Sequence, residues 1–157
     1  MCLLTGCGGS RSPRKDPGVE PRPSAAPVEG APANLARIGE VESMAIASRI
    51  QTAHPIGPYS ATIRVDQAAA AYGKPARGPM PAGSMIVEAL SREQDGPVEL
   101  YYVMQRMPKG YFPEGGDWNY AVVAPDGTIK AGGKLALCAR CHAEAAREHL
   151  FEYVTAP

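Results

Sequence analysis

The sequence predicts an α+β fold: mainly an antiparallel β-sheet, with an N-terminal helix and a second helix at the C-terminal end. Strands are expected over residues 84–90, 98–107 and 118–124, of which 98–107 is the clearest because β-branched and aromatic side chains occur throughout it. Turn sequences such as Asp95-Gly96-Pro97 separate these runs. Two longer segments are expected to be helical, one before these strands in the sequence and one after them.

The first helix is expected over residues 34–52. Asn34 can cap its N-terminus. His54-Pro55 should end it, because a residue before proline avoids the α region. The apolar stripe of this helix comprises Leu35, Ile38, Val41, Ala45 and Ile50.

The remaining elements alternate between short strands and turns. We expect a strand at 61–65, one or two helical turns at 66–72, and a return strand at 128–130 after the turn at 125–127. Gly132-Gly133 then breaks the chain before a helix over 135–149, and residues 150–154 extend as a last strand or pack on that helix.

The N-terminal residues predict a lipoprotein. Residues 1–7 end in Leu4-Thr5-Gly6-Cys7, which looks like a bacterial lipobox whose signal peptide lacks its start, and Cys7 would carry the lipid. Residues 8–33 are rich in proline, glycine and serine, so they should form a disordered tether. The folded domain is expected over 34–157, facing the periplasm from a lipid-anchored position.

Charge and size exclude several classes of protein. The 157 residues suffice for one domain with a real core, and the Lys+Arg and Asp+Glu counts are both 16. This balance gives no electrostatic case for nucleic acid or for an anionic membrane surface. The sequence has no apolar run of about 20 residues that could span a bilayer.

The most specific motif is Cys138-Ala139-Arg140-Cys141-His142, a CxxCH pentapeptide. It is the attachment signature of a covalent c-type haem. Residues three apart share one helical face, so both thiols can bond one haem while His142 reaches the iron. A structural zinc half-site and a thiol–disulfide pair are the alternatives.

The cysteine count fits an oxidising compartment. Cys2 would be removed with the signal, Cys7 would be lipidated, and Cys138 and Cys141 would hold one haem c. No free thiol would remain, as expected outside the cytoplasm.

The C-terminal position of the motif is unlike that of the common small electron-transfer cytochromes, and the strands before it argue against the helical cytochrome c′. The chain after the tether carries a series of short motifs: Pro81-Ala82-Gly83-Ser84-Met85-Ile86-Val87-Glu88, Tyr102-Val103-Met104-Gln105-Arg106, Gly110-Tyr111-Phe112-Pro113, Gly116-Asp117-Trp118-Asn119-Tyr120, Asp126-Gly127, Cys138 to His142, and Glu152-Tyr153-Val154. In the order and spacing of these motifs it resembles the cytochrome P-460 family.

This resemblance implies a haem with His142 as proximal iron ligand, an open distal face and a homodimer. The name-giving enzymes oxidise hydroxylamine and carry a lysine cross-linked to the haem. Glu88 stands where many relatives carry that lysine, which argues against the cross-link and against that reaction.

Glu88 shares a predicted strand face with Ile86 and Leu90, which looks inward. One interpretation is a distal acid–base group over the iron. The others are a structural ion pair with an arginine such as Arg106, and exposure of that face to solvent.

The sequence leaves three functions open. The favoured one is turnover of a small ligand such as hydroxylamine, nitric oxide or peroxide by a haem oxidoreductase served by a redox partner protein. The second is electron transfer with a protein sixth ligand, and the third is gas binding without turnover. The candidate sixth ligands are Met80, Met85, Met104 and Met107, of which Met80 is the best because it lies in a predicted loop.

Overall fold

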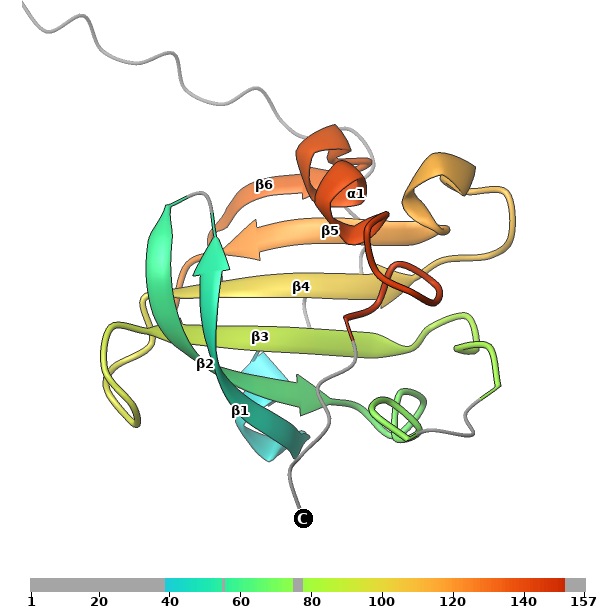
Figure 1. Ribbon diagram of the computed structural model, residues 1–157. Coiled ribbons are helices and arrows are strands. Elements are labelled where there is room, and N and C mark those ends of the chain that lie inside the picture. Colours follow the sequence, from blue (N-terminus) through green and yellow to red (C-terminus); the bar gives the residue numbers. More distant parts are fainter. Residues whose placement is uncertain (1–38, 55, 75–77, 152–157) are drawn as a thin grey trace, which may run out of the picture.

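The computed structural model describes residues 39–54, 56–74 and 78–151. Its centre is one six-stranded antiparallel sheet in which each strand pairs with its neighbour in the sequence (Figure 1). The strands are β1 (Ala45–His54), β2 (Gly57–Val65), β3 (Met85–Ser91), β4 (Leu100–Arg106), β5 (Trp118–Val123) and β6 (Ile129–Gly133). A 3₁₀ turn, η2 (Pro113–Gly115), precedes β5, and one short helix, α1 (Ala136–His142), follows β6.

The predicted strands of the central sheet are confirmed, with small shifts at their ends. The runs at 84–90, 98–107 and 118–124 correspond to β3, β4 and β5, and the return strand at 128–130 lies at the start of β6. The strand predicted at 61–65 begins earlier, at Gly57. Residues 66–72 form turns instead of helix.

The predicted N-terminal helix is wrong. Residues 39–43 form a 3₁₀ turn and Ala45–His54 form strand β1, while residues 34–38 lie outside the described part. From Ser48 to His54 the side chains alternate between half-buried and exposed, which is the period of a strand. β1 pairs with β2 along its whole length, from Ala45 opposite Val65 to His54 opposite Gly57, and this pairing overrides the helical spacing.

The long C-terminal haem-bearing helix predicted over 135–149 is also not formed. α1 has seven residues, and the N–H groups of Glu144 and Ala145 then bond the carbonyls three residues back. Glu148 and His149 have φ of 51° and 60°, in the left-handed region that no α-helix contains. The α+β class with a helix at each end is therefore wrong, and the described chain is a sheet with one short C-terminal helix.

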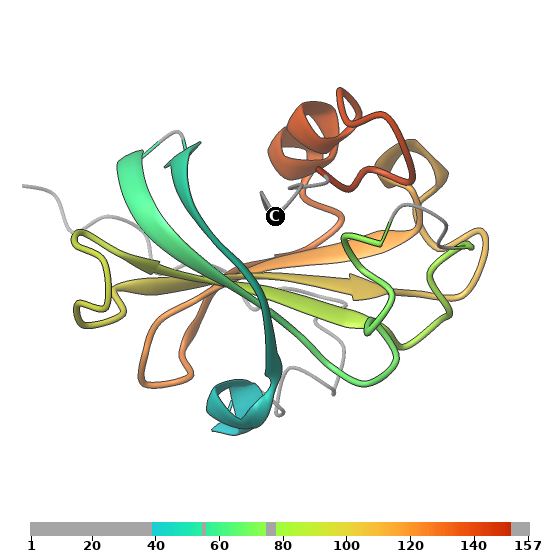
Figure 2. The ribbon, with the colours of Figure 1, turned by 60° about the horizontal axis from the view of Figure 1, so that its bottom comes forward.

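Apolar side chains cover both faces of the sheet. On one face Val87, Val103 and Val123 pack with Val41 and Met44 from the segment before β1. On the other, Ile86, Met104 and Trp118 pack with Ala139 of α1 and with Leu150. Figure 2 shows the β1–β2 hairpin and α1 rising on this second side, so both overhang the same sheet face.

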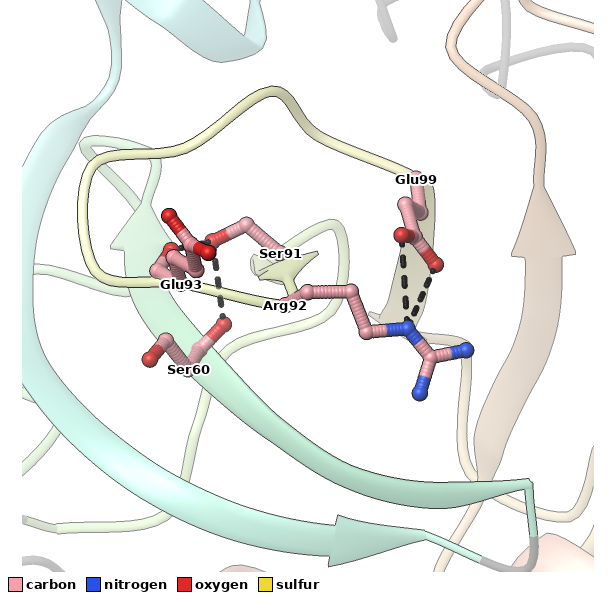
Figure 3. Close-up of polar contacts among 5 residues, drawn as sticks. All are labelled: Ser60, Ser91, Arg92, Glu93 and Glu99. Atoms are coloured by element: carbon pink, nitrogen blue, oxygen red, sulfur yellow. Dashed lines mark hydrogen bonds and ion pairs between the residues drawn. The ribbon is translucent and has the colours of Figure 1, made fainter.

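The β3–β4 connection is fastened by side chains at its base (Figure 3). The Ser91 hydroxyl lies 2.8 Å from the carbonyl of Glu93 and 3.4 Å from that of Ser60. Arg92 Nε donates to the Glu99 carboxylate at 3.1 and 3.3 Å. Both of these charged side chains are largely exposed, so the pair contributes little to stability.

The described helices include none with the length and hydrophobicity that a membrane span requires. Residues 1–7 with the lipobox, including Cys7, and the tether at 8–33 lie outside the described part.

A buried aspartate joins two parts of the fold, and its removal should destabilise the protein. Asp66 Oδ1 accepts the N–H groups of Ala69 at 2.9 Å and Met85 at 3.1 Å. We expect Asp66→Ala to lower the free energy of unfolding by about 1–3 kcal/mol, because it leaves a buried N–H without its acceptor. Urea denaturation measures this loss.

The matched control is Asp126→Ala, since Asp126 Oδ1 accepts the Thr128 N–H at 2.9 Å in an exposed turn. Water can replace that acceptor, so its loss should be clearly smaller. Equal losses in the two variants would contradict the assigned role of Asp66.

Candidate functional site

Helix α1 carries the CxxCH motif. Cys138 and Cys141 are both free thiols, Cys138 half-buried and Cys141 exposed. Cys138 packs against the core cluster that contains Ala139 and Leu150, which turns its side of the helix toward the sheet. The two cysteines are three residues apart on a helix, so they lie on one face as the motif requires.

His142, the last residue of α1, is held by one hydrogen bond and two rings. Its Nδ1 lies 2.7 Å from the carbonyl oxygen of His149. A carbonyl can only accept, so Nδ1 carries the proton and Nε2 keeps a lone pair. The rings of Tyr120 and Phe151 lie at centroid distances of 5.5 and 5.3 Å from the imidazole.

Burial sets the charge state of this histidine. Desolvation lowers the pKa of His142, and the hydrogen bond to the His149 carbonyl opposes that shift more weakly. The neutral imidazole with a free Nε2 is the form that binds iron or another metal. His142 therefore has its Nδ1 occupied by the His149 carbonyl, and in the neutral form its Nε2 keeps a lone pair.

The carbonyl that orients His142 belongs to a tightly held turn. Trp118 Nε1 donates to the Glu148 carbonyl at 2.8 Å. The Glu148 carboxylate accepts the Met80 N–H at 3.2 Å and forms an ion pair with Arg106 at 3.4 Å. These contacts hold Glu148 and His149 in the left-handed conformation that such residues rarely adopt unaided.

Breaking this anchor should loosen the hold on His142. We expect Glu148→Ala to lower stability by about 1–3 kcal/mol, because the buried Met80 N–H loses its acceptor. We also expect a weaker Nδ1–H bond, seen as faster hydrogen exchange of that proton by NMR. Glu144→Ala, at an exposed position of the same segment, is the control. An unchanged exchange rate in Glu148→Ala would contradict the anchoring role.

Glu88, His54 and Tyr102 form a second group on the same sheet face. Glu88 lies in the middle of β3, directly opposite Tyr102 of β4. Its Oε2 lies 2.8 Å from His54 Nε2, and the two side chains are only 16% and 19% exposed. The His54 ring stacks on Tyr102 at 4.3 Å with an angle of 6° between the planes.

Electrostatic effects relate this group to α1. Desolvation and the hydrogen bond to the His149 carbonyl have the two largest effects on the pKa of His142. The Glu88 carboxylate has a smaller effect and raises this pKa, and His54 lowers it. Burial raises the pKa of Tyr102, with smaller contributions from Cys138 and Glu88. His54, Glu88 and Tyr102 therefore lie within electrostatic range of the CxxCH motif.

The structure gives the surroundings of Glu88 and of the methionines. Glu88 pairs with His54, whereas Arg106 pairs with Glu148. Met85 packs on the sheet face away from α1. Met80 and Met104 are buried in the cluster on the α1 side, where Cys138 also packs.

Two contributors were missed from the sequence. The sequence pattern predicts that His54 ends a helix, whereas its place at the end of strand β1 depends on the pairing of β1 with β2. His149 contributes through its backbone carbonyl, which no sequence pattern reveals.

The described ranges contain no group of three or more His, Cys, Asp or Glu residues arranged to hold a metal ion. Two surface hollows lie elsewhere, one beside Arg49, Gln51 and Gln94 and one beside Glu42, Arg64 and Tyr101. The candidate site is thus defined by side-chain contacts around α1.

No family model matches the chain, and no curated protein sequence matches it either.

Proposed function

We propose that the chain is a mono-haem c-type cytochrome that resembles the cytochrome P-460 family and binds, oxidises or reduces a small ligand. Hydroxylamine, nitric oxide and peroxide are the ligands of this class. The observation that carries the proposal is the CxxCH motif on one helix, with the His142 Nδ1–H donated to the His149 carbonyl at 2.7 Å.

The residues present suit a covalent haem c. Cys138 and Cys141 would form the thioether bonds, and His142 Nε2 would bind the iron as proximal ligand. When bound, the haem would supply an iron site for the ligand and one-electron chemistry. A proximal histidine that donates its other N–H to a carbonyl is a more basic and better oriented ligand.

The surrounding side chains support an asymmetric site. Tyr120 and Phe151 restrain the His142 ring on the proximal side. The Glu88–His54 pair would supply a carboxylate and an imidazole to the ligand, and we assign proton transfer to or from the ligand to this pair. Because Glu88 stands at the matched lysine position, the proposal includes no lysine–haem cross-link.

Electron transfer is the second candidate. Met80 and Met104 lie in the apolar cluster that also contacts Cys138, so a methionine sulfur is available on the α1 side as a sixth ligand. Such a ligand would close the distal face and exclude turnover. Gas binding without turnover is the remaining alternative.

The proposal also covers the location of the protein. Lipid on Cys7 and the tether over 8–33 would hold the haem domain at a membrane surface, facing the periplasm. The electrons would pass to or from a redox partner protein, and the resemblance favours a homodimer.

The decisive test of the haem assignment is the mass of the denatured chain. The chain is produced behind a bacterial secretion signal in bacteria that carry a cytochrome c maturation system. We expect the unfolded chain to retain one haem, seen by mass spectrometry and by haem staining of a denaturing gel. A chain that carries zinc, or a Cys138–Cys141 disulfide, and no haem would refute the proposal.

A further inference from the structure

The His54–Glu88–Tyr102 group is built to hold one imidazole in one orientation. Glu88 restrains the ring by a 2.8 Å hydrogen bond to Nε2, and Tyr102 restrains its plane by parallel stacking at 4.3 Å.

The hydrogen bond defines which nitrogen is available. In the neutral tautomer with the proton on Nε2, His54 donates a hydrogen bond to the Glu88 carboxylate. Nδ1 then keeps its lone pair, and within the described ranges the hydrogen bonds of His54 end with the one to Glu88. The group therefore offers one unused imidazole acceptor, oriented by a carboxylate in the manner of histidine–carboxylate pairs in acid–base catalysis.

The His54–Glu88 pair lies on the sheet face that α1 also overhangs. The β1–β2 hairpin overhangs the same sheet face as α1 (Figure 2), and Glu88 reaches His54 from the centre of that face. The pair is four-fifths buried, so it is shielded from bulk solvent. Interactions of a ligand proton with an imidazole are stronger in such a site than in water.

We infer that His54 is the residue that contacts the small ligand, accepting a proton from it through Nδ1 and donating a hydrogen bond back, and that Glu88 is its positioning residue. This inference rests on the proposed haem site. It assigns the ligand class as protic molecules that lose a proton on binding, such as hydrogen peroxide, hydroxylamine or hydrogen cyanide. Carbon monoxide has no proton to give, so its binding is independent of this base.

Hydrogen cyanide and carbon monoxide are the two probes, used on the haem-loaded full-length protein. Hydrogen cyanide gives its proton to the His54 imidazole and binds as the cyanide anion, and the imidazolium N–H then donates to the bound anion. No electron is transferred in this step, so no oxidant or reductant is needed.

The variants are His54→Leu and Glu88→Gln, with Thr52→Val as a control on the same side of β1. We expect His54→Leu to slow cyanide association by about 100-fold or more, the scale of a general base. Glu88→Gln should slow it by about 10-fold, the scale of a lost orienting partner. Thr52→Val should match the parent, and the carbon monoxide dissociation constant should be unchanged in all three.

A second measurement distinguishes direct contact between His54 and the ligand from an indirect effect of the substitution on the structure. The stretching frequency of bound carbon monoxide, measured by infrared spectroscopy, reports polar groups next to the ligand. We expect it to fall in His54→Leu, because the Nδ1 lone pair that raises it is removed, and to stay constant in Thr52→Val, with thermal unfolding recorded for each variant to identify any loss of fold.

Three results would overturn the inference while leaving the haem assignment intact. One is parent-like cyanide kinetics and carbon monoxide frequency in a folded His54→Leu protein. Another is a parallel weakening of cyanide and carbon monoxide binding, which would make His54 purely structural. The third is a low-spin parent that becomes high-spin in His54→Leu, because His54 itself would then bind the iron. A chain without haem would instead refute the proposed function.

Discussion

Replacing both motif cysteines with serine should abolish covalent haem attachment. Cys138→Ser with Cys141→Ser keeps the size of each side chain but removes the sulfur that forms the thioether bond. Both positions lie on a helix, Cys141 is exposed and Cys138 is half-buried, so the fold should tolerate the change. We expect the denatured double variant to carry no haem by mass spectrometry and by gel staining, while each single variant retains a reduced fraction.

The control is Cys7→Ser, which removes the expected lipid site and leaves the motif intact. This variant should keep its haem and move from the membrane fraction to the soluble periplasmic fraction. Haem that survives denaturation in the double-serine protein would mean that attachment occurs elsewhere and would contradict the assignment of Cys138 and Cys141.

The largest loss of stability should come from Trp118→Ala. Trp118 is fully buried in the cluster beneath α1, its Nε1 donates to the Glu148 carbonyl at 2.8 Å, and the Arg106 guanidinium lies 5.4 Å from its ring. Truncation of a large buried aromatic side chain costs about 3–5 kcal/mol. Urea denaturation should show this loss, together with a weakened hold on the His142 ring.

Trp118→Phe separates the two contributions of the indole. Phenylalanine keeps most of the buried apolar surface but leaves the Glu148 carbonyl without its donor, at a cost of about 1–3 kcal/mol. We expect the order parent, Trp118→Phe, Trp118→Ala in decreasing stability. A Trp118→Ala protein as stable as the parent would show that the packing beneath α1 does not support the site.

The central strands could be predicted because their apolar residues indicate burial in the core. In β3 and β4, apolar residues are buried on both faces of the sheet, and turn residues follow β3 in the sequence. The prediction of a helix at β1 is wrong because the apolar residues there also fit the spacing of one face of a helix. The identity of β1 is decided by pairing with β2, a tertiary effect outside any local window.

The candidate site was predictable only in part. The spacing of Cys138, Cys141 and His142 pointed to one helix face, and these residues lie on α1. The helix stops at His142 because the following turn is held by Trp118, Arg106 and Met80, which are distant in the sequence. The pairing of Glu88 with His54 depends on the curled hairpin, which no spacing rule gives.

The central claim is a haem with His142 on one side and an exchangeable position beside His54 and Glu88 on the other. The optical spectrum of the purified full-length protein, ferric and then ferrous with and without carbon monoxide, tests it most directly. We predict a high-spin ferric spectrum and a ferrous spectrum that shifts on addition of carbon monoxide. A low-spin spectrum in both oxidation states that carbon monoxide leaves unchanged would contradict the claim and identify an electron-transfer cytochrome.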